Sequence, residues 1–467
     1  MRRRKMRPCS VRYLADACGG TVTGDSGYLV RDIKIDSRAC GDGDLFVCVI
    51  GEINDGHNFV RSAYDNGCRA FLVSRDVELP EDAVLIHTDD TMQAFRHMAE
   101  TYLAQFNVRK IGVTGSVGKT TTKMLTAAVA SAKYRTICSQ KNLNTHLGVC
   151  LTCFLADETT ECVVFEMGMD HKGEIEEYIE WTKPEIAIIT NIGISHMERL
   201  GSRDAIADAK LEIVLQFNDD CVLVVNSRSD YLKTEEEIRA RALNKSNFKI
   251  VMLGRDIDFR DVRNLGEDGI DFYVGDVKVE LPLLGEHNAI DACLAIAAGW
   301  QLGISTEEAA EALGKVTATE RRLKAAKVGE VYLLDDSYNA SPDSMKAGIA
   351  ALCGVDAKRR IAVLGDMLEL GGADEEGHTA VGEYAAEKGV DILIATGKRK
   401  EYYFKGVSRS GKTGTSTIGL EDLDSVKDMV LQILKPGDAV LVKGSNSTGL
   451  GQVAELIRTS EERWKRS

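Results

Sequence analysis

The stretch VTGSVGKTT, at positions 113–121, constrains this chain more than any other part of its sequence. An apolar strand precedes a turn that contains Gly115, and the pattern predicts a helix that begins at Lys119. In such a unit the glycines let backbone N–H groups face a polyphosphate, and the helix N-terminus adds partial positive charge. We therefore predict a nucleotide-phosphate site here, in which Lys119 reaches the β- and γ-phosphates and Thr120 binds Mg²⁺.

This phosphate loop (residues 113–121) departs from the general pattern G-x-x-x-x-G-K-[ST] at one end. Val113 stands where the first glycine or alanine is expected, and Gly115 lies two positions further in. A chance Gly-Lys-Thr on a surface loop is the alternative interpretation. The predicted strand–loop–helix context favours the phosphate site.

Composition limits the class of protein. A length of 467 residues suggests about three domains. The net charge of −14 argues against a general nucleic-acid-binding or anionic membrane surface, although a small anionic ligand can still be held by local groups. The basic start at 1–7 is followed by no apolar run, so it does not predict a secretory signal. No segment approaches the ~20 apolar residues of a membrane span, and a cytoplasmic location is expected.

Twelve cysteines in an acidic chain of this length indicate reduced thiols rather than a disulfide framework. Cys150 and Cys153 have C-x-x-C spacing, but a metal site of this kind needs a second such pair, and the sequence has none. The two are predicted to be small hydrophobic residues on a helix, with a zinc site as the alternative.

The pattern of elements predicts an α/β protein of three domains. The first, residues 1–107, is a small mixed domain with a helix at Val11–Cys18, strands on either side of a turn at 36–44, a helix leading into a strand at 64–73, a strand at 83–87 and an amphipathic helix from Met92 to Phe106. It carries no catalytic constellation of its own.

The second predicted domain, residues 108–317, contains the phosphate loop. Its apolar runs suit strands that are buried on both faces, which predicts a mainly parallel sheet with strands at 111–113, 163–165, 186–189 and 222–225. Residues 251–280 are predicted to form inserted hairpins. The third domain, residues 318–467, is predicted to be doubly wound and Rossmann-like, although it lacks G-x-G-x-x-G, with strands at 331–334, 361–364, 392–394 and 439–442.

Several polar residues follow the predicted central strands. Glu166 and His196 both lie at carboxyl ends of strands in the sheet that carries the phosphate loop, where open sheets bind ligands, and this favours a metal–nucleotide site. Alternatively, Glu166 caps a helix and His196 only donates a hydrogen bond. By composition Lys210 is a solvent-exposed lysine on a helix. Asn288 precedes an alanine-rich helix and has an N-terminal cap as its alternative role.

Five segments together resemble the ATP-dependent Mur ligases, namely VTGSVGKTT, VFEMGMDHKGEI, TNIGISHMERLGS, ADAKLEI and GEHNAIDACLAIAAG. The resemblance covers nearly the whole chain and includes the order of the three domains. Within the family, DDSYNASPDSM (335–345) and VLGDMLELG (363–371) are similar to the ligase that joins D-alanyl-D-alanine to UDP-N-acetylmuramoyl-tripeptide. The segment IDSRACGDGDLFVCVIGEINDGHNF is similar to that ligase's uridine-nucleotide-binding domain.

The resemblance implies roles for individual residues. ATP phosphates would be held by Gly115, Ser116, Gly118, Lys119, Thr120 and Thr121. Mg²⁺ would be placed by Thr120, Glu166, His196 and a carbamylated Lys210. The catalytic residues would be Lys119, Glu166, His196 and Lys210. Adenosine would be contacted by Asn288, Asp336 and Asn339, the γ-phosphate by Arg322, and the uridine diphosphate by Asp36, Ser37 and Arg38.

The resemblance thus implies four ligands, namely ATP, Mg²⁺, UDP-N-acetylmuramoyl-tripeptide and D-alanyl-D-alanine. It also implies a monomer that binds neither nucleic acid nor membrane. Three positions depart from the family pattern. Ser341 replaces a usual asparagine and Cys150 a usual proline, and both changes are expected to alter packing only. Asn446 follows KGS where arginine is common, which bears on the dipeptide contacts of the third domain.

Other classes share the phosphate loop. A regulatory GTPase should carry N-K-x-D, but Asn244 and Lys245 are followed by Ser246 and Asn247. A phosphate-loop kinase is not excluded by the loop alone, whereas a non-catalytic scaffold would not need Glu166, His196 and Lys210 together. The neighbouring ligase, which adds the third amino acid, usually carries a D-N-P-R-type motif that is absent here. Folylpolyglutamate synthetase lacks such a uridine-nucleotide domain.

Overall fold

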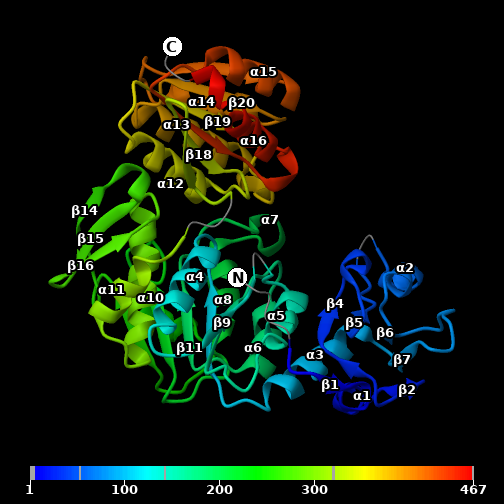
Figure 1. Ribbon diagram of the computed structural model, residues 1–467. Coiled ribbons are helices and arrows are strands. Elements are labelled where there is room, and N and C mark those ends of the chain that lie inside the picture. The colour runs from blue at the N-terminus through cyan, green and yellow to red at the C-terminus, as the bar shows by residue number, and fades with distance from the viewer. Residues whose placement is uncertain (1–5, 52–53, 141–142, 318–320, 465–467) are drawn as a thin grey trace. The chain divides into compact units, whose positions relative to one another are not determined.

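The computed structural model describes residues 6–51, 54–140, 143–317 and 321–464 (Figure 1). The chain divides into two compact units. One comprises Met1–Gly112, Tyr134–Gly168 and Glu177–Glu185, and the other comprises Val113–Lys133, Met169–Glu176 and Ile186–Ser467.

The N-terminal part is built on a five-stranded sheet. Its strand order is β2 (Thr21–Thr23), β7 (Val84–His87), β6 (Ala70–Val73), β5 (Asp44–Val47) and β4 (Asp32–Lys34), and only β2 pairs antiparallel. A two-stranded antiparallel sheet of β1 (Cys9–Ser10) and β3 (Leu29–Val30) accompanies it, with helices α1 (Val11–Cys18), α2 (Val60–Asp65) and α3 (Thr91–Leu103).

Local capping explains where α1 begins and ends. The Ser10 side chain accepts a hydrogen bond from the Tyr13 N–H, and Gly19 follows the helix in the left-handed conformation that suits glycine. The predicted bounds of α1 are confirmed. The amphipathic helix predicted to reach Phe106 ends at Leu103 instead, because the chain turns there through short-range backbone hydrogen bonds.

The central sheet has six strands. Their order is β13 (Lys249–Leu253), β12 (Val222–Asn226), β11 (Ile186–Ile189), β8 (Arg109–Thr114), β10 (Cys162–Glu166) and β9 (Thr136–Cys138). The four predicted strands are confirmed, and β10–β9, β11–β12 and β12–β13 pair in parallel. The helices of this region are α4 (Lys119–Ala130), α5 (His146–Cys153), α6 (Glu174–Thr182), α7 (Met197–Leu200), α8 (Arg203–Leu211), α9 (Glu235–Arg241), α10 (Glu286–Gln301) and α11 (Thr306–Leu313).

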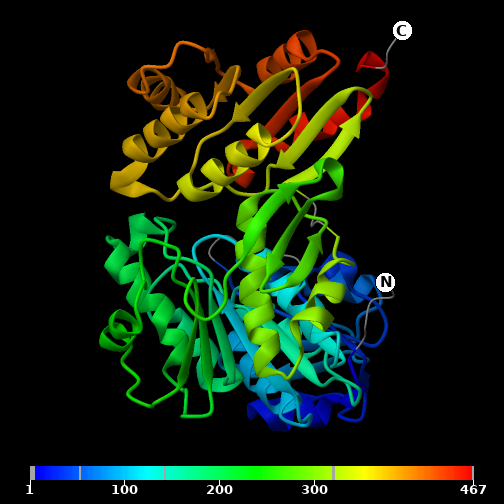
Figure 2. The same cartoon turned by 90° about the vertical axis from the view of Figure 1, so that its left-hand side faces the viewer.

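The prediction of hairpins over 251–280 was wrong at its first residues. Val251 to Leu253 belong to β13, a parallel edge strand of the central sheet, and the antiparallel part begins only at β14 (Arg260–Asn264). It continues through β15 (Ile270–Val274) and β16 (Val277–Leu281), green in Figures 1 and 2. A short apolar run does not distinguish the two kinds of strand by periodicity.

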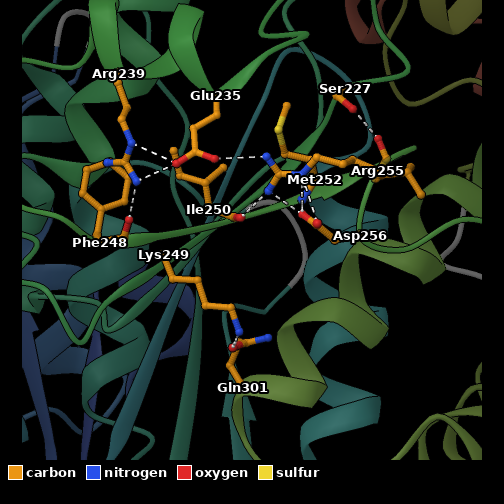
Figure 3. Close-up of polar contacts among 11 residues, drawn as sticks. Ser227, Glu235, Arg239, Phe248, Lys249, Ile250, Met252, Arg255, Asp256 and Gln301 are labelled. Atoms are coloured by element: carbon orange, nitrogen blue, oxygen red, sulfur yellow. Dashed lines mark hydrogen bonds and ion pairs between the residues drawn. The ribbon is translucent and has the colours of Figure 1, made fainter.

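Charged side chains form hydrogen bonds with the backbone at the start of β13, the edge strand (Figure 3). Glu235 on α9 accepts hydrogen bonds from Arg239 and Arg255, each at 3.0 Å. The two guanidinium groups in turn donate to the backbone oxygens of Phe248 (2.8 Å) and Ile250 (2.9 Å). Side-chain donors therefore bind backbone acceptors at the start of β13.

The C-terminal sheet also has six strands. Their order is β17 (Lys324–Val328), β18 (Val331–Asp336), β22 (Asp438–Lys443), β19 (Arg359–Leu364), β20 (Ile392–Thr396) and β21 (Ser416–Leu420), and only β17 pairs antiparallel. Successive side chains of β18 point to opposite faces of the sheet. On one face, Leu334 packs with α12 (Pro342–Cys353), α13 (Asp374–Glu387) and α14 (Lys400–Arg409). Leu333 packs with α15 (Leu423–Ile433) and α16 (Gly451–Thr459), and helices on both faces make the sheet doubly wound.

The twelve cysteines are free thiols. Cys150 and Cys153 are buried on α5, which confirms the prediction that they lie on a helix. Among the residues that the structure describes, no group of three or more His, Cys, Asp or Glu side chains is arranged to hold a metal ion. No helix in those ranges is both long and apolar enough to cross a membrane.

Candidate active site

Two glycines of the phosphate loop lie too close to neighbouring side chains for any other residue. Gly115 has φ +149°, and a Cβ there would lie 1.8 Å from Thr190 Oγ1. Gly118 has φ +85°, and a Cβ there would lie 2.8 Å from an oxygen of Asp291. The loop ends where α4 begins, at Lys119, as predicted. The displaced glycine noted in the sequence is therefore a close-packing position of this loop.

The segment that follows β11 holds the phosphate loop in shape. Asn191 accepts the Ser116 N–H at its backbone oxygen (3.1 Å) and the Val117 N–H at its side-chain oxygen (2.8 Å). The Gly193 N–H donates to Ser116 Oγ at 2.9 Å. Sequence reasoning recognised a polar run at the end of this buried strand, but it missed that Asn191 and Gly193 hold the phosphate loop.

Lys119 and Thr120 occupy the first turn of α4. Lys119 Nζ donates to the backbone oxygens of Gly115 (2.8 Å) and Ser116 (3.2 Å), so its ammonium lies against the loop. Thr120 is buried. The N-terminal end of α4, with its partial positive charge, therefore carries a cation and a hydroxyl next to the loop's N–H groups.

Glu166 ends β10, the strand beside β8 in the sheet order, as predicted. It is buried, and its Oε1 accepts a hydrogen bond from Asn144 Nδ2 at 3.1 Å. Its own N–H donates to Ser139 Oγ at 3.1 Å. A carboxylate fixed in this way at the end of a strand has the donor type that a hard divalent cation prefers.

His196 directly precedes α7 and is contacted by two carboxylates. Its Nδ1 lies 3.1 Å from an oxygen of Asp170 and 3.1 Å from an oxygen of Glu369. The hydrogen bond from His196 lowers the pKa of Glu369, and burial opposes that shift. Sequence reasoning missed both carboxylates, although each lies in a segment quoted for the family resemblance.

Lys210 lies on α8, as predicted, but the expectation of a solvent-exposed lysine was wrong, because only 1% of it is exposed. Burial lowers its pKa well below the usual value, and the charge of Lys119 adds to this effect. Lys210 is therefore a buried amine that favours the uncharged form.

Two of the residues predicted to contact adenosine, Asp336 and Asn339, lie against Lys443. Its Nζ lies 2.6 Å from Asp336 Oδ2 and donates to the backbone oxygen of Asn339 at 2.9 Å. Burial and the charge of Lys443 lower the pKa of His287, near the start of α10, to about 4. The Arg322 guanidinium lies over the Tyr338 ring, 4.2 Å from its centre.

Asn288 does not cap its helix. It is the third residue of α10, which Gly285 precedes, and its Nδ2 donates to the Leu284 backbone oxygen at 2.6 Å. The alternative interpretation as an N-terminal cap was wrong by three positions, because the helix extends further toward Gly285 than the alanine-rich run suggested.

Asp36, Ser37 and Arg38 form a short turn after β4. Asp36 accepts the Arg38 N–H at 3.0 Å and pairs with its guanidinium at 2.9 and 2.8 Å. Ser37 is buried, and its backbone oxygen accepts from Asn66 Nδ2. A cavity of about 120 Å³ adjoins Asp36 and is walled by the apolar side chains of Ile33, Leu143 and Leu155, among others.

Three family models match successive parts of the chain. The family model described as "Mur ligase family, catalytic domain" matches residues 30–111, "Mur ligase middle domain" matches 113–299, and "Mur ligase, glutamate ligase domain" matches 321–446. The chain belongs to the Mur ligase family.

Within that family the similarity extends to particular members. UDP-N-acetylmuramoyl-tripeptide–D-alanyl-D-alanine ligase of Bacillus subtilis is 34% identical over 453 residues, which are 96% of this chain and 97% of the relative. A crystal structure of MurF from Acinetobacter baumannii has a TM-score of 0.86 at 28% identity and covers 97% of this chain and 99% of its own. MurF from Thermotoga maritima, solved with ADP, has a TM-score of 0.77 at 24% identity and covers 92% and 98%.

Asp291 is a further residue that sequence reasoning missed. It lies on α10, is 6% exposed and touches the phosphate loop at Gly118. Burial raises its pKa to about 8, so the carboxyl group is mostly protonated at neutral pH. The sequence offered only an acidic residue on an otherwise apolar helix as a signal.

We predict that Asp291→Asn raises the free energy of unfolding at neutral pH. The folded pKa of Asp291 is above its unfolded value, so the contribution of this residue to stability is fully present below about pH 4 and is lost as pH rises toward 8. The neutral amide escapes this loss, which amounts to about 4 kcal/mol at pH 7 if relieved completely. Urea unfolding at pH 5 and pH 8 tests the prediction, with the exposed Asp16→Asn as control. An Asp291→Asn effect that is equal at both pH values would contradict it.

Proposed function

We propose that this chain is the ATP-dependent ligase that joins D-alanyl-D-alanine to UDP-N-acetylmuramoyl-tripeptide in peptidoglycan precursor synthesis. The observation that carries the proposal is the 34% identity to a ligase of that name over nearly the full length of both chains. A cytoplasmic location and a monomeric state belong to the same proposal.

The reaction needs chemical activation of a carboxylate. A carboxylate is a poor electrophile, because loss of hydroxide or oxide from its carbon is unfavourable. Transfer of the γ-phosphoryl group of ATP to the terminal carboxylate of the tripeptide gives an acyl phosphate and ADP. The dipeptide amine then attacks the acyl carbon, and the tetrahedral intermediate loses phosphate and a proton to give the amide. Catalysis consists largely of positioning the groups and offsetting negative charge.

The phosphate loop supplies part of that charge compensation. We assign the ATP phosphates to Gly115, Ser116, Gly118, Lys119, Thr120 and Thr121, and the Lys119 ammonium lies against this loop. The γ-phosphate is assigned to Arg322, and the adenosine to Asn288, Asp336 and Asn339. The relative solved with ADP supports the use of ATP.

A magnesium ion fits the chemistry of the remaining donors. Thr120 has a hydroxyl, Glu166 a buried carboxylate, and His196 a ring nitrogen whose partner nitrogen meets two carboxylates. We assign these three residues to the metal, together with Lys210 as a carbamate. A bound Mg²⁺ would offset charge on the transferring phosphoryl group. Proteins usually hold Mg²⁺ through a few carboxylates and substrate phosphates, which agrees with this set.

The other substrate needs its own recognition site. We assign the uridine diphosphate to the turn of Asp36, Ser37 and Arg38, where the guanidinium is largely exposed and therefore accessible to an anion. Movement of the domains around the three ligands would exclude water, which otherwise hydrolyses an acyl phosphate.

Phosphate release tests the proposed function directly. We expect the purified chain to release phosphate from ATP only when both UDP-N-acetylmuramoyl-tripeptide and D-alanyl-D-alanine are present, with the UDP-pentapeptide as product by mass spectrometry. Parallel reactions with lysine or diaminopimelate at the third peptide position identify the preferred substrate. Equal turnover without the dipeptide would instead indicate an ATPase or kinase.

Lys119→Ala should abolish ligation and leave the fold intact. The ammonium is replaced by a methyl group, so charge that develops on the phosphoryl group loses a compensating cation, and we expect at least a ~10²-fold fall in kcat. Product formation and circular dichroism are the measurements, with the exposed Lys315→Ala as the matched control. A folded Lys119→Ala protein with near wild-type turnover would remove the phosphate loop from the active site.

Lys210→Ala should also lose most activity without loss of fold. An uncharged amine is the form that reacts with CO₂, and burial favours that form here. The carbamate would replace an amine by an anion beside Mg²⁺. We expect short-chain carboxylates to restore part of the activity of Lys210→Ala, and removal of CO₂ and bicarbonate to lower wild-type activity.

The exposed Lys233→Ala is the control for the Lys210 experiment. It should behave as wild type in both carboxylate and CO₂-free buffers. Full activity of Lys210→Ala in ordinary buffer would disprove the carbamate.

A further inference from the structure

The segment VLGDMLELG (363–371) marks the family resemblance, but the chemistry above gives it no role. After β19 it continues as an irregular segment that hydrogen bonds hold just before the exposed carboxylate of Glu369. The Met367 N–H donates to His378 Nε2 at 3.0 Å, and the Leu368 N–H donates to Ser445 Oγ at 3.1 Å. The Met367 side chain is buried in the hydrophobic cluster below. The backbone that carries Glu369 is therefore held in place.

Glu369 meets His196 where both backbones are strained. Their φ angles are +66° and +63°, in the left-handed region that non-glycine residues rarely adopt. The two segments also touch through the backbone, because the Glu198 N–H donates to the Glu369 oxygen at 3.4 Å. A Cβ at Gly371 would lie 2.9 Å from the Glu198 Cα, so the approach leaves no room for a larger residue.

The contact determines which ring nitrogen of His196 carries a proton. Its Nδ1 lies 3.1 Å from Asp170 Oδ1 and 3.1 Å from Glu369 Oε2, and a carboxylate can only accept. The other oxygen of Asp170 is held by Arg199 at 3.1 Å. Nδ1 therefore donates, which leaves Nε2 as the nitrogen whose lone pair is available to a metal. Metal-binding histidines commonly have this arrangement.

We infer that Glu369 is a positioning residue for His196, and that with Asp170 it fixes the ring so that Nε2 serves as the metal ligand. The inference rests on the metal role given to His196 in the proposed function. Because Glu369 follows β19 of the C-terminal sheet while His196 follows β11 of the central sheet, the metal ligand is fully oriented only when these two segments meet.

Manganese binding measures this positioning without catalysis. Mn²⁺ replaces Mg²⁺, a non-hydrolysable ATP analogue is present, and the free Mn²⁺ signal is followed by electron paramagnetic resonance. We expect Glu369→Ala to weaken Mn²⁺ binding by ~10-fold or more, the usual cost of losing a group that orients a metal ligand. Glu369→Gln should keep near wild-type affinity, because its amide oxygen still accepts from Nδ1–H.

Two further variants complete the comparison. Glu375→Ala removes another carboxylate after β19, one that pairs with Lys405 at 2.5 Å, and should bind Mn²⁺ like wild type. His196→Ala tests the metal assignment itself and should weaken binding at least as much as Glu369→Ala. Circular dichroism and thermal melting establish that each variant is folded.

The outcomes separate the inference from the function beneath it. Weak binding by Glu369→Ala with rescue by Glu369→Gln supports the inference. Wild-type affinity in Glu369→Ala, or equal losses in Glu369→Ala and Glu369→Gln, overturns it while His196→Ala still reports a metal ligand. Wild-type affinity in His196→Ala would overturn both the metal assignment and the inference drawn from it.

Discussion

The close approach of the phosphate loop to its neighbours is the constraint on which the candidate site is built. Thr190 and Asp291 leave no space for a Cβ at Gly115 and Gly118, so both positions of the loop require glycine. Asn191 then satisfies two N–H groups of the same loop. A loop that is shaped before its ligand arrives loses little conformational entropy on binding, which benefits both affinity and rate.

Buried ionisable groups next to this loop and at the start of α10 favour their uncharged forms. Burial disfavours the charged form of Lys210, Asp291 and His287, each by the same physical cause. The Lys119 side chain lies against the loop, where its Nζ donates to the backbone oxygens of Gly115 and Ser116.

Much of the fold was predictable from the sequence, because strands that are buried on both faces consist of consecutive apolar residues. The four central strands were found in this way, whereas the start of α4 at Lys119 was predicted from the phosphate-loop motif. Lys210 was misjudged because a single residue type says nothing of the helix face it occupies, and α8 is buried at Ile206 and Leu211 as well. The hydrogen bonds of Asn191 to the phosphate loop and the contact of Glu369 with His196 join segments that are far apart in the chain. Such contacts cannot be predicted from a single sequence.

The thiols of this chain illustrate a different consequence of burial. Cys150 and Cys162 lie in the apolar interior, and burial raises the pKa of each to about 12. Oxidants and alkylating reagents attack the thiolate, which is nearly absent at such a pKa, so these sulfurs are chemically quiet while the chain is folded. The rate at which a thiol reagent alkylates them therefore measures how often the surrounding core unfolds locally.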